Sequence, residues 1–169
     1  MRKRSLLAAS VLICISSCDL IPRKLSWDDP RLVPLLTAID SVDRTSLGFA
    51  PIDRTSTVRL ESRPRAAYDS MLHIDGQPSR TVAFRKTANG YKWIHEQECW
   101  TGPKTYKTVD GTFHEQIFIT YGIEPVSGHA PNKLHVEYWG EDPRLPAHRP
   151  LSLDQVRPIL AEWKQSPKA

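Results

Sequence analysis

The chain has 169 residues, of which 40% are apolar, and its formal net charge is +4. This length suffices for one domain of ordinary size and is too short for two. The composition excludes a disordered tail and a membrane protein with several spanning helices.

The first residues have the pattern of an export signal. The basic stretch Arg2-Lys3-Arg4 precedes a short apolar run that ends at Ile15. This arrangement is typical of a secretory signal peptide. The apolar run is well short of the ~20 residues that a membrane-spanning helix needs. We therefore expect residues 1–17 to be a signal peptide that is absent from the mature protein.

The end of this segment indicates the type of signal. Ile15-Ser16-Ser17-Cys18 resembles the lipobox of bacterial lipoproteins, which has an aliphatic residue, two small residues and then a cysteine. The resemblance covers residues 1–18 only. It implies that the Cys18 thiol receives a diacylglycerol, that cleavage occurs before Cys18, and that the new amine is acylated. The alternative is an ordinary secretory signal in which this cysteine is a coincidence.

The resemblance also implies a location. A lipoprotein of this kind is anchored to the cell membrane by its lipid and faces the periplasm. Asp19 follows the cysteine, and in enteric bacteria an aspartate there resembles the signal that retains lipoproteins in the inner membrane. We therefore expect inner-membrane attachment, with the outer membrane as the alternative.

Charge and cysteine content disfavour nucleic-acid binding and thiol chemistry. Three of the 23 basic residues lie in the signal peptide, so 20 remain against 19 acidic ones. Nucleic-acid binding depends on clustered positive charge, and no basic run of five or more residues remains, so we expect no such partner. Once Cys18 carries its lipid, Cys99 is the one thiol left, so we expect no intrachain disulfide. The neighbouring Glu98 disfavours a thiolate, so we expect an inert thiol.

The mature chain divides into three parts. Residues 18–28 are predicted to form a lipidated tether, residues 29–165 a single domain, and residues 166–169 a frayed tail. Asp29-Pro30 is typical of a helix N-terminus. Apolar residues at helical spacing follow it and predict a helix over residues 30–44.

From residue 56 onward, apolar and polar residues alternate as they do in strands. Asn89-Gly90 and Asp110-Gly111 are hairpin signals, and residues 101–104 resemble a further turn. These features predict an antiparallel meander of six or seven strands. Ser152 then begins a capping-box pattern and a C-terminal helix. The expected fold class is therefore α+β, with one sheet flanked by an N-terminal and a C-terminal helix.

The predicted strand register suggests a candidate site. A two-residue turn at Asp110-Gly111 pairs Lys107 with His114 and places both on a solvated face, together with Glu98. It places Glu115 on the core face, with His95 and Tyr106 as expected neighbours. Glu115 is then a candidate general base or ligand-orienting group in a pocket between sheet and helices. The alternative is a hydrogen-bonded structural carboxylate.

Other catalytic patterns are missing from the sequence. The tripeptide His-Glu-Gln occurs at residues 95–97 and 114–116, but neither copy continues as a zinc-binding His-Glu-x-x-His. No phosphate-binding or dinucleotide-binding loop occurs either, so we expect neither a metal nor a cofactor. Trp100 and Trp139 fall on the nominally polar side of their strands. They indicate either a contact surface or a second layer that covers them.

Taken together, these features favour a lipid-anchored envelope protein that acts as a binding or structural module. Its expected partner is an envelope protein or an apolar small molecule. The alternatives are a small enzyme with its pocket near Glu115, and a carrier of an apolar ligand. Buried convergent polar groups would favour the enzyme, an empty apolar cavity the carrier, and a filled core the interaction module.

Overall fold

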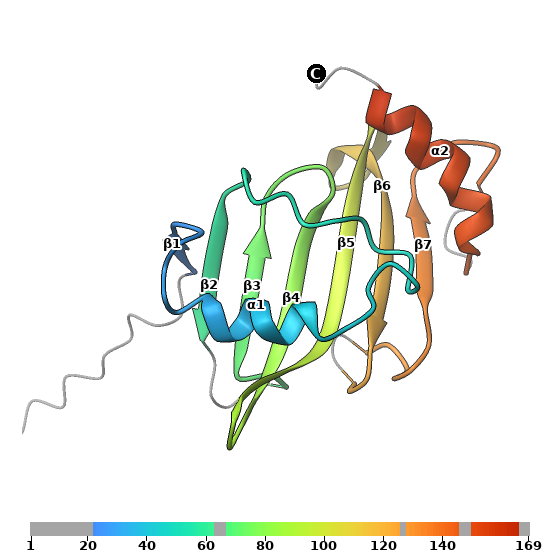
Figure 1. The fold of residues 1–169 in the computed structure, drawn as a ribbon. Helices are drawn as coiled ribbons and strands as arrows, with labels where there is room; N and C mark the ends of the chain where they lie inside the picture. The colour runs from blue at the N-terminus through green and yellow to red at the C-terminus, as the bar shows by residue number, and fades with distance from the viewer. Residues whose placement is uncertain (1–21, 63–66, 126–127, 146–149, 166–169) are drawn as a thin grey trace, which may run out of the picture.

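A computed structural model describes residues 22–62, 67–125, 128–145 and 150–165 (Figure 1). The predicted signal peptide, the predicted lipidation site Cys18, the predicted sorting residue Asp19 and the predicted tail at 166–169 lie outside the described residues. In the part that is described, no helix has the length and apolar character that crossing a membrane requires.

The fold is α+β and is built on one antiparallel sheet in which each strand lies beside its neighbours in sequence. The predicted meander and its two flanking helices are confirmed. The strands are β1 (Arg23–Leu25), β2 (Val58–Ser62), β3 (Ser70–Ile74), β4 (Ser79–Thr87), β5 (Gly90–Thr108), β6 (Gly111–Gly122) and β7 (His135–Trp139). The helices are α1 (Val33–Asp40) and α2 (Leu153–Gln165).

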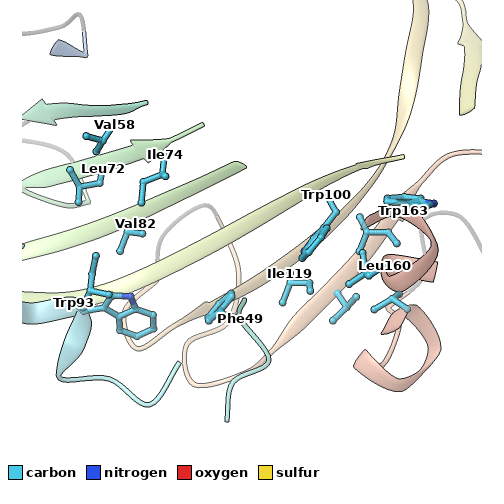
Figure 2. Packing of buried hydrophobic residues seen from close by; sticks show 14 of the residues in the cluster. Phe49, Val58, Leu72, Ile74, Val82, Trp93, Trp100, Ile119, Leu160 and Trp163 are labelled. Atoms are coloured by element: carbon cyan, nitrogen blue, oxygen red, sulfur yellow. The ribbon is translucent and has the colours of Figure 1, made fainter. Parts of the chain in front are cut away.

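Both helices cover the same face of the sheet, α1 across the strands of the first half and α2 toward β7 (Figure 1). This face, called here the inner face, carries the main hydrophobic core. Leu35 and Ile39 of α1, and Leu160 and Trp163 of α2, pack in one cluster with the inward side chains of the strands. Figure 2 shows Trp163 beside Trp100 of β5. The opposite face is called the outer face.

The helix ends show which local signals operate. Helix α1 begins at Val33, three residues later than predicted. Asp29 instead closes a tight turn, because its Oδ1 accepts a hydrogen bond of 2.9 Å from the backbone N–H of Arg31. The capping box of α2 is confirmed. The Ser152 N–H donates to Gln155 Oε1 at 2.8 Å, and Ser152 Oγ accepts from the Gln155 N–H at 3.4 Å.

The sheet starts earlier than predicted, because β1 lies within the segment expected to be a tether and pairs Leu25 with Val58. Both predicted hairpins form, but each turn is centred one residue earlier than predicted. At the second one, Val109 and Asp110 form the turn, and Gly111, with φ +139°, begins β6. Lys107 therefore pairs with Thr112, and its predicted pairing with His114 is wrong by two residues.

A β-bulge in β5 changes which side chains face the core. Phe84 of β4 pairs with Trp93, but the adjacent Ala83 pairs with His95, so Ile94 is an extra residue. An extra residue reverses the alternation of every later side chain in the strand. Glu96, Glu98 and Trp100 consequently face inward, whereas His95 and Cys99 face outward. The predicted solvated position of Glu98 and polar-side position of Trp100 are therefore wrong.

The predicted turn at residues 101–104 is also wrong. Strand β5 continues through this segment with a second irregularity, in which Thr101 pairs with Gln116 and Thr105 with His114. Beyond it, β5 and β6 pair only with each other in the described chain, because the register of β7 with β6 ends at Gln116. We call this two-stranded extension, Thr105–Thr108 with Gly111–His114, the arm.

Candidate functional site

Glu115 lies on the inner face, as predicted, and its side chain is engaged. It is only 2% exposed. One carboxylate oxygen accepts a hydrogen bond of 2.9 Å from the Tyr138 hydroxyl, and the other accepts one of 3.2 Å from the Lys104 N–H. A methyl group at Gly102 or Gly140 would overlap the Glu115 side chain. The carboxylate is thus enclosed by closely packed backbone.

The partners of Glu115 bind the segment after β7. The Tyr138 hydroxyl also accepts a hydrogen bond of 2.7 Å from the Asp142 N–H. Burial, together with the carboxylate of Glu115, raises the pKa of Tyr138 above its ordinary value, so the phenol stays protonated. Hydrogen bonds from Arg144 lower the pKa of Asp142 to about 2, so this carboxylate is ionised at neutral pH. The cluster fixes the chain that leads to α2.

The structure does not bring His95 or Tyr106 to Glu115. His95 lies on the outer face opposite Gly122, 2% exposed, and in the described chain neither ring nitrogen has a hydrogen-bond partner. Its burial, and next the nearby His129, lower its pKa to about 4, so the ring is neutral at pH 7. Tyr106 lies in the arm, with its ring 6.1 Å from that of Phe113.

A buried charge network, which the sequence analysis missed, lies under the loop after α1. Arg80 Nη2 is 2.8 Å from Glu98 Oε1, and both side chains are almost fully buried. Arg44 Nε donates to Glu96 Oε2 at 2.8 Å. Glu98 also accepts hydrogen bonds from the Ala50 N–H at 2.8 Å and from the Trp100 indole N–H at 3.1 Å.

The network balances two guanidinium groups against two carboxylates. Burial raises the pKa of Glu98, although Arg80 acts in the opposite direction. Burial also lowers the pKa of Arg80, whose Nε and Nη1 have no hydrogen-bond partner among the described residues. Because the side chains are enclosed by the core and engage one another, we interpret the network as a structural element that fixes the loop to the sheet.

An open cleft lies where the arm and the end of β7 diverge. Its volume is about 530 Å³, which falls in the range of small-molecule sites. Trp139 and Phe113 are 44% and 45% exposed, so two large aromatic side chains border this open space. The predicted polar-side position of Trp139 is thus confirmed. The cleft is lined by Tyr106, Lys107, Thr108, Asp110, Phe113, Gln116, Trp139, Gly140 and Glu141.

A second hollow continues this cleft along the outer face. Its volume is about 220 Å³, and it shares Gln116 and Trp139 with the larger one. Phe118 and Glu137, which pair across β6 and β7, and Gln97 of β5 complete its lining. The Phe118 ring meets Trp139 edge-on at 6.4 Å. We call the two hollows together the outer cleft.

Two further observations concern metal and thiol chemistry. Among the described residues, no group of three or more His, Cys, Asp or Glu side chains could hold a metal ion. Cys99 lies on the outer face beside a hollow of about 170 Å³ that also includes His73. Burial raises the pKa of the Cys99 thiol, which keeps it protonated at neutral pH.

Comparison of the chain with models of protein families, with curated proteins and with solved structures gives no match. The outer cleft therefore has to be interpreted from its own chemistry. The sequence carried one signal for it, the aromatic residue Trp139 on the polar side of its strand. The arm and its contribution of Tyr106 and Phe113 had no signal, because residues 101–104 resemble a turn.

Proposed function

We propose that this protein is a lipid-anchored envelope protein whose domain is a binding module, and that the outer cleft is its binding site. The observation that carries the proposal is the exposure of Trp139 and Phe113 around a cleft of about 530 Å³. Large apolar side chains that border an open concavity are characteristic of binding sites. The lipobox-like segment that ends at Cys18 supports the anchor and the periplasmic location.

The geometry of the sheet suits an anchored binding module. Arg23 begins β1 five residues after Cys18, and five residues span at most about 17 Å. The outer cleft lies at the β7 end of the sheet, six strand spacings from β1. At about 4.8 Å per spacing this is roughly 29 Å. A protein anchored at Cys18 would thus hold its β1 edge near the bilayer and its cleft on the distant edge.

The enzyme alternative centred on Glu115 has less support. The carboxylate is hydrogen-bonded to Tyr138 and to the Lys104 N–H, and closely packed backbone surrounds it. A general base needs an atom within reach of a substrate proton, and this packing encloses the two oxygens, each of which already accepts one hydrogen bond. The outer cleft offers open space, and we therefore favour binding over catalysis.

Two measurements test the proposal. Mass spectrometry of the mature protein should find Cys18 at the N-terminus with its lipid attached, and Cys18→Ser should abolish both the lipid and membrane attachment. For the cleft, a photo-crosslinking amino acid is placed at Phe113 in growing cells. Val33, which is 60% exposed on α1, is the control position. Position 113 should yield an envelope adduct that Trp139→Ala reduces about tenfold.

Each part can fail separately. An intact signal, or a mature N-terminus elsewhere, contradicts the anchor. Equal adduct yields at positions 113 and 33, or an adduct that Trp139→Ala leaves unchanged, contradicts the assignment of the binding site to the outer cleft.

A further inference from the structure

The outer cleft holds polar side chains that bind no other group within the described part of the chain. Gln116, Glu137, Glu141 and Asp110 line its two hollows around Trp139. In the part of the chain that the structure describes, none of these four side chains makes a hydrogen bond or ion pair. Ordered polar groups on a sheet that lack protein partners are available to a ligand.

The chemistry of these groups restricts the ligand. A carboxylate only accepts hydrogen bonds, and an amide both donates and accepts. Three carboxylates and one amide therefore suit a ligand that is rich in hydroxyl or N–H donors. Lys107 is the one cation in the lining of the two hollows. The excess of negative charge disfavours phosphates and other anions.

The aromatic side chains add a second requirement. Trp139 is held edge-on by Phe118, with 6.4 Å between ring centres, so the indole is positioned before a ligand arrives. Phe113, packed on Tyr106, forms the wall that the arm provides. An exposed indole binds a flat ligand surface with little polar character. The ligand must thus combine an apolar face with a rim of hydrogen-bond donors.

A sugar ring has this combination, since its axial C–H groups form an apolar face and its hydroxyl groups form a donor-rich edge. Resting on the proposed binding function, we propose that the outer cleft binds a neutral oligosaccharide of at least two rings. One ring stacks on Trp139, and Gln116, which borders both hollows, binds hydroxyl groups at the junction. The larger and smaller hollows, of about 530 and 220 Å³, take successive parts of the chain.

An extended basic peptide is the competing ligand. Before Gln116, β6 pairs with β5 on one side. On its other side no strand of the described chain lies beside it, so a peptide could add there as a strand. The carboxylates would then pair with its cations. The side-chain composition favours the sugar, because the uncommitted carboxylates surround an indole face, and the peptide is an explicit outcome of the test.

The test uses the purified full-length protein in a detergent that has no sugar head group. The probes are neutral tetrasaccharides of β-1,4-linked glucose, β-1,4-linked N-acetylglucosamine and α-1,4-linked glucose, one tetrasaccharide of galacturonic acid, and a peptide of alternating lysine and valine. Saturation-transfer NMR reports which ligand protons touch the protein. At least one neutral tetrasaccharide should show transfer to the C–H protons of one ring face, and the anionic one should show none.

Variants locate the contact. Trp139→Ala should weaken neutral-sugar binding about tenfold or more, and Trp139→Phe should restore part of it, because a stacking face returns. Glu137→Gln should weaken neutral-sugar binding only about threefold, since the amide still accepts a hydrogen bond. Val33→Ala is the control and should have no effect. Unfolding midpoints equal to that of the native protein show that the variants are folded.

Five results would overturn the proposal. The first is binding of the basic peptide alone, with a loss of more than about tenfold in Glu137→Gln, which would assign the cleft to peptides. The second is equal binding of the anionic tetrasaccharide. The third is sugar binding that Trp139→Ala does not change. The fourth is no probe binding while the adduct at position 113 persists, which rejects the sugar class and keeps the binding module. Loss of both signals rejects the binding module too.

Discussion

Replacing Arg80 by methionine should expose how much the buried charge network depends on its balance. Methionine has a similar length and no charge, so the change leaves Glu98 without the guanidinium that lies 2.8 Å from it. The Ala50 N–H and the Trp100 indole N–H still bind this carboxylate. The network then holds Arg44 against two carboxylates, with a net charge of −1 in the core.

Removing one partner of a buried ion pair costs about 3–5 kcal/mol of unfolding free energy, because the remaining charge is left uncompensated. We expect this loss for Arg80→Met in urea unfolding at pH 8. The native burial already raises the pKa of Glu98, and the loss of Arg80 raises it further. The folded variant then binds a proton more readily than its unfolded chain, so its deficit should shrink as the pH falls from 8 toward 5.

Two further variants separate charge imbalance from lost packing. Arg80→Met combined with Glu98→Gln restores a neutral network, and it should lie within about 1.5 kcal/mol of the native protein. Arg59→Met is the surface control. Arg59 Nη2 is 2.7 Å from Asp75 Oδ1, but both side chains are close to half exposed, so the loss should stay under about 1 kcal/mol. A double variant as unstable as Arg80→Met alone would refute the reasoning.

Two other predictions concern stability. His95 has a pKa of about 4 in the folded protein against 6.5 in the unfolded chain, so the unfolded state binds more protons between these values. Unfolding free energy should therefore fall by up to about 3 kcal/mol between pH 7 and pH 4. His95→Leu should lack this part of the pH dependence. The control His114→Ala, at an exposed position, should keep it. Gly102→Ala should lower the unfolding free energy in urea several times more than Thr101→Ala does, because the added methyl would lie 2.6 Å from the Trp163 ring and overlap Glu115. Equal losses for the two variants would show that this packing can relax.

Local signals in the sequence predicted the fold well. Alternating polarity and two glycine turns are enough to define a meander, since each strand pairs with the next one in the chain. The capping pattern at Ser152 likewise acts within one helical turn. Asp29 shows the limit of such signals, because the same residue type closes a tight turn as readily as it caps a helix.

The candidate site was harder to predict because it depends on irregularities within β5. The bulge at Ile94 is flanked by Trp93 and His95, and no glycine or proline marks it. If side chains are assumed to alternate without a break through the bulge, His95 is placed inward with Glu115 and Glu98 is placed outward. This is the reverse of the structure. Trp139 lies on a strand with no bulge in its described pairing, and there the alternation correctly predicted exposure.

The bulge can be tested by deletion. Removing Ile94 would place His95 directly after Trp93, so that Trp93 and Glu96 still face inward and the pairs on both sides of the bulge become continuous. The variant loses a buried side chain and the hydrogen bond of 2.8 Å from the Ile123 N–H to the Ile94 carbonyl. Even so, the variant should keep a cooperative unfolding transition, and its unfolding free energy should fall by about 2–5 kcal/mol.

Removing Gln97 deletes one residue from the same strand at a position where the pairing is regular, while the bulge at Ile94 stays in place. Every later inward side chain of β5, including Glu98 and Trp100, would turn outward, and the charge network and core would both be lost. We therefore expect no cooperative transition in circular dichroism for this variant. If the two deletions behave alike, then Ile94 is not the extra residue that decides which side chains of β5 face inward. The assignment of Glu96 and Glu98 to the core then loses its explanation.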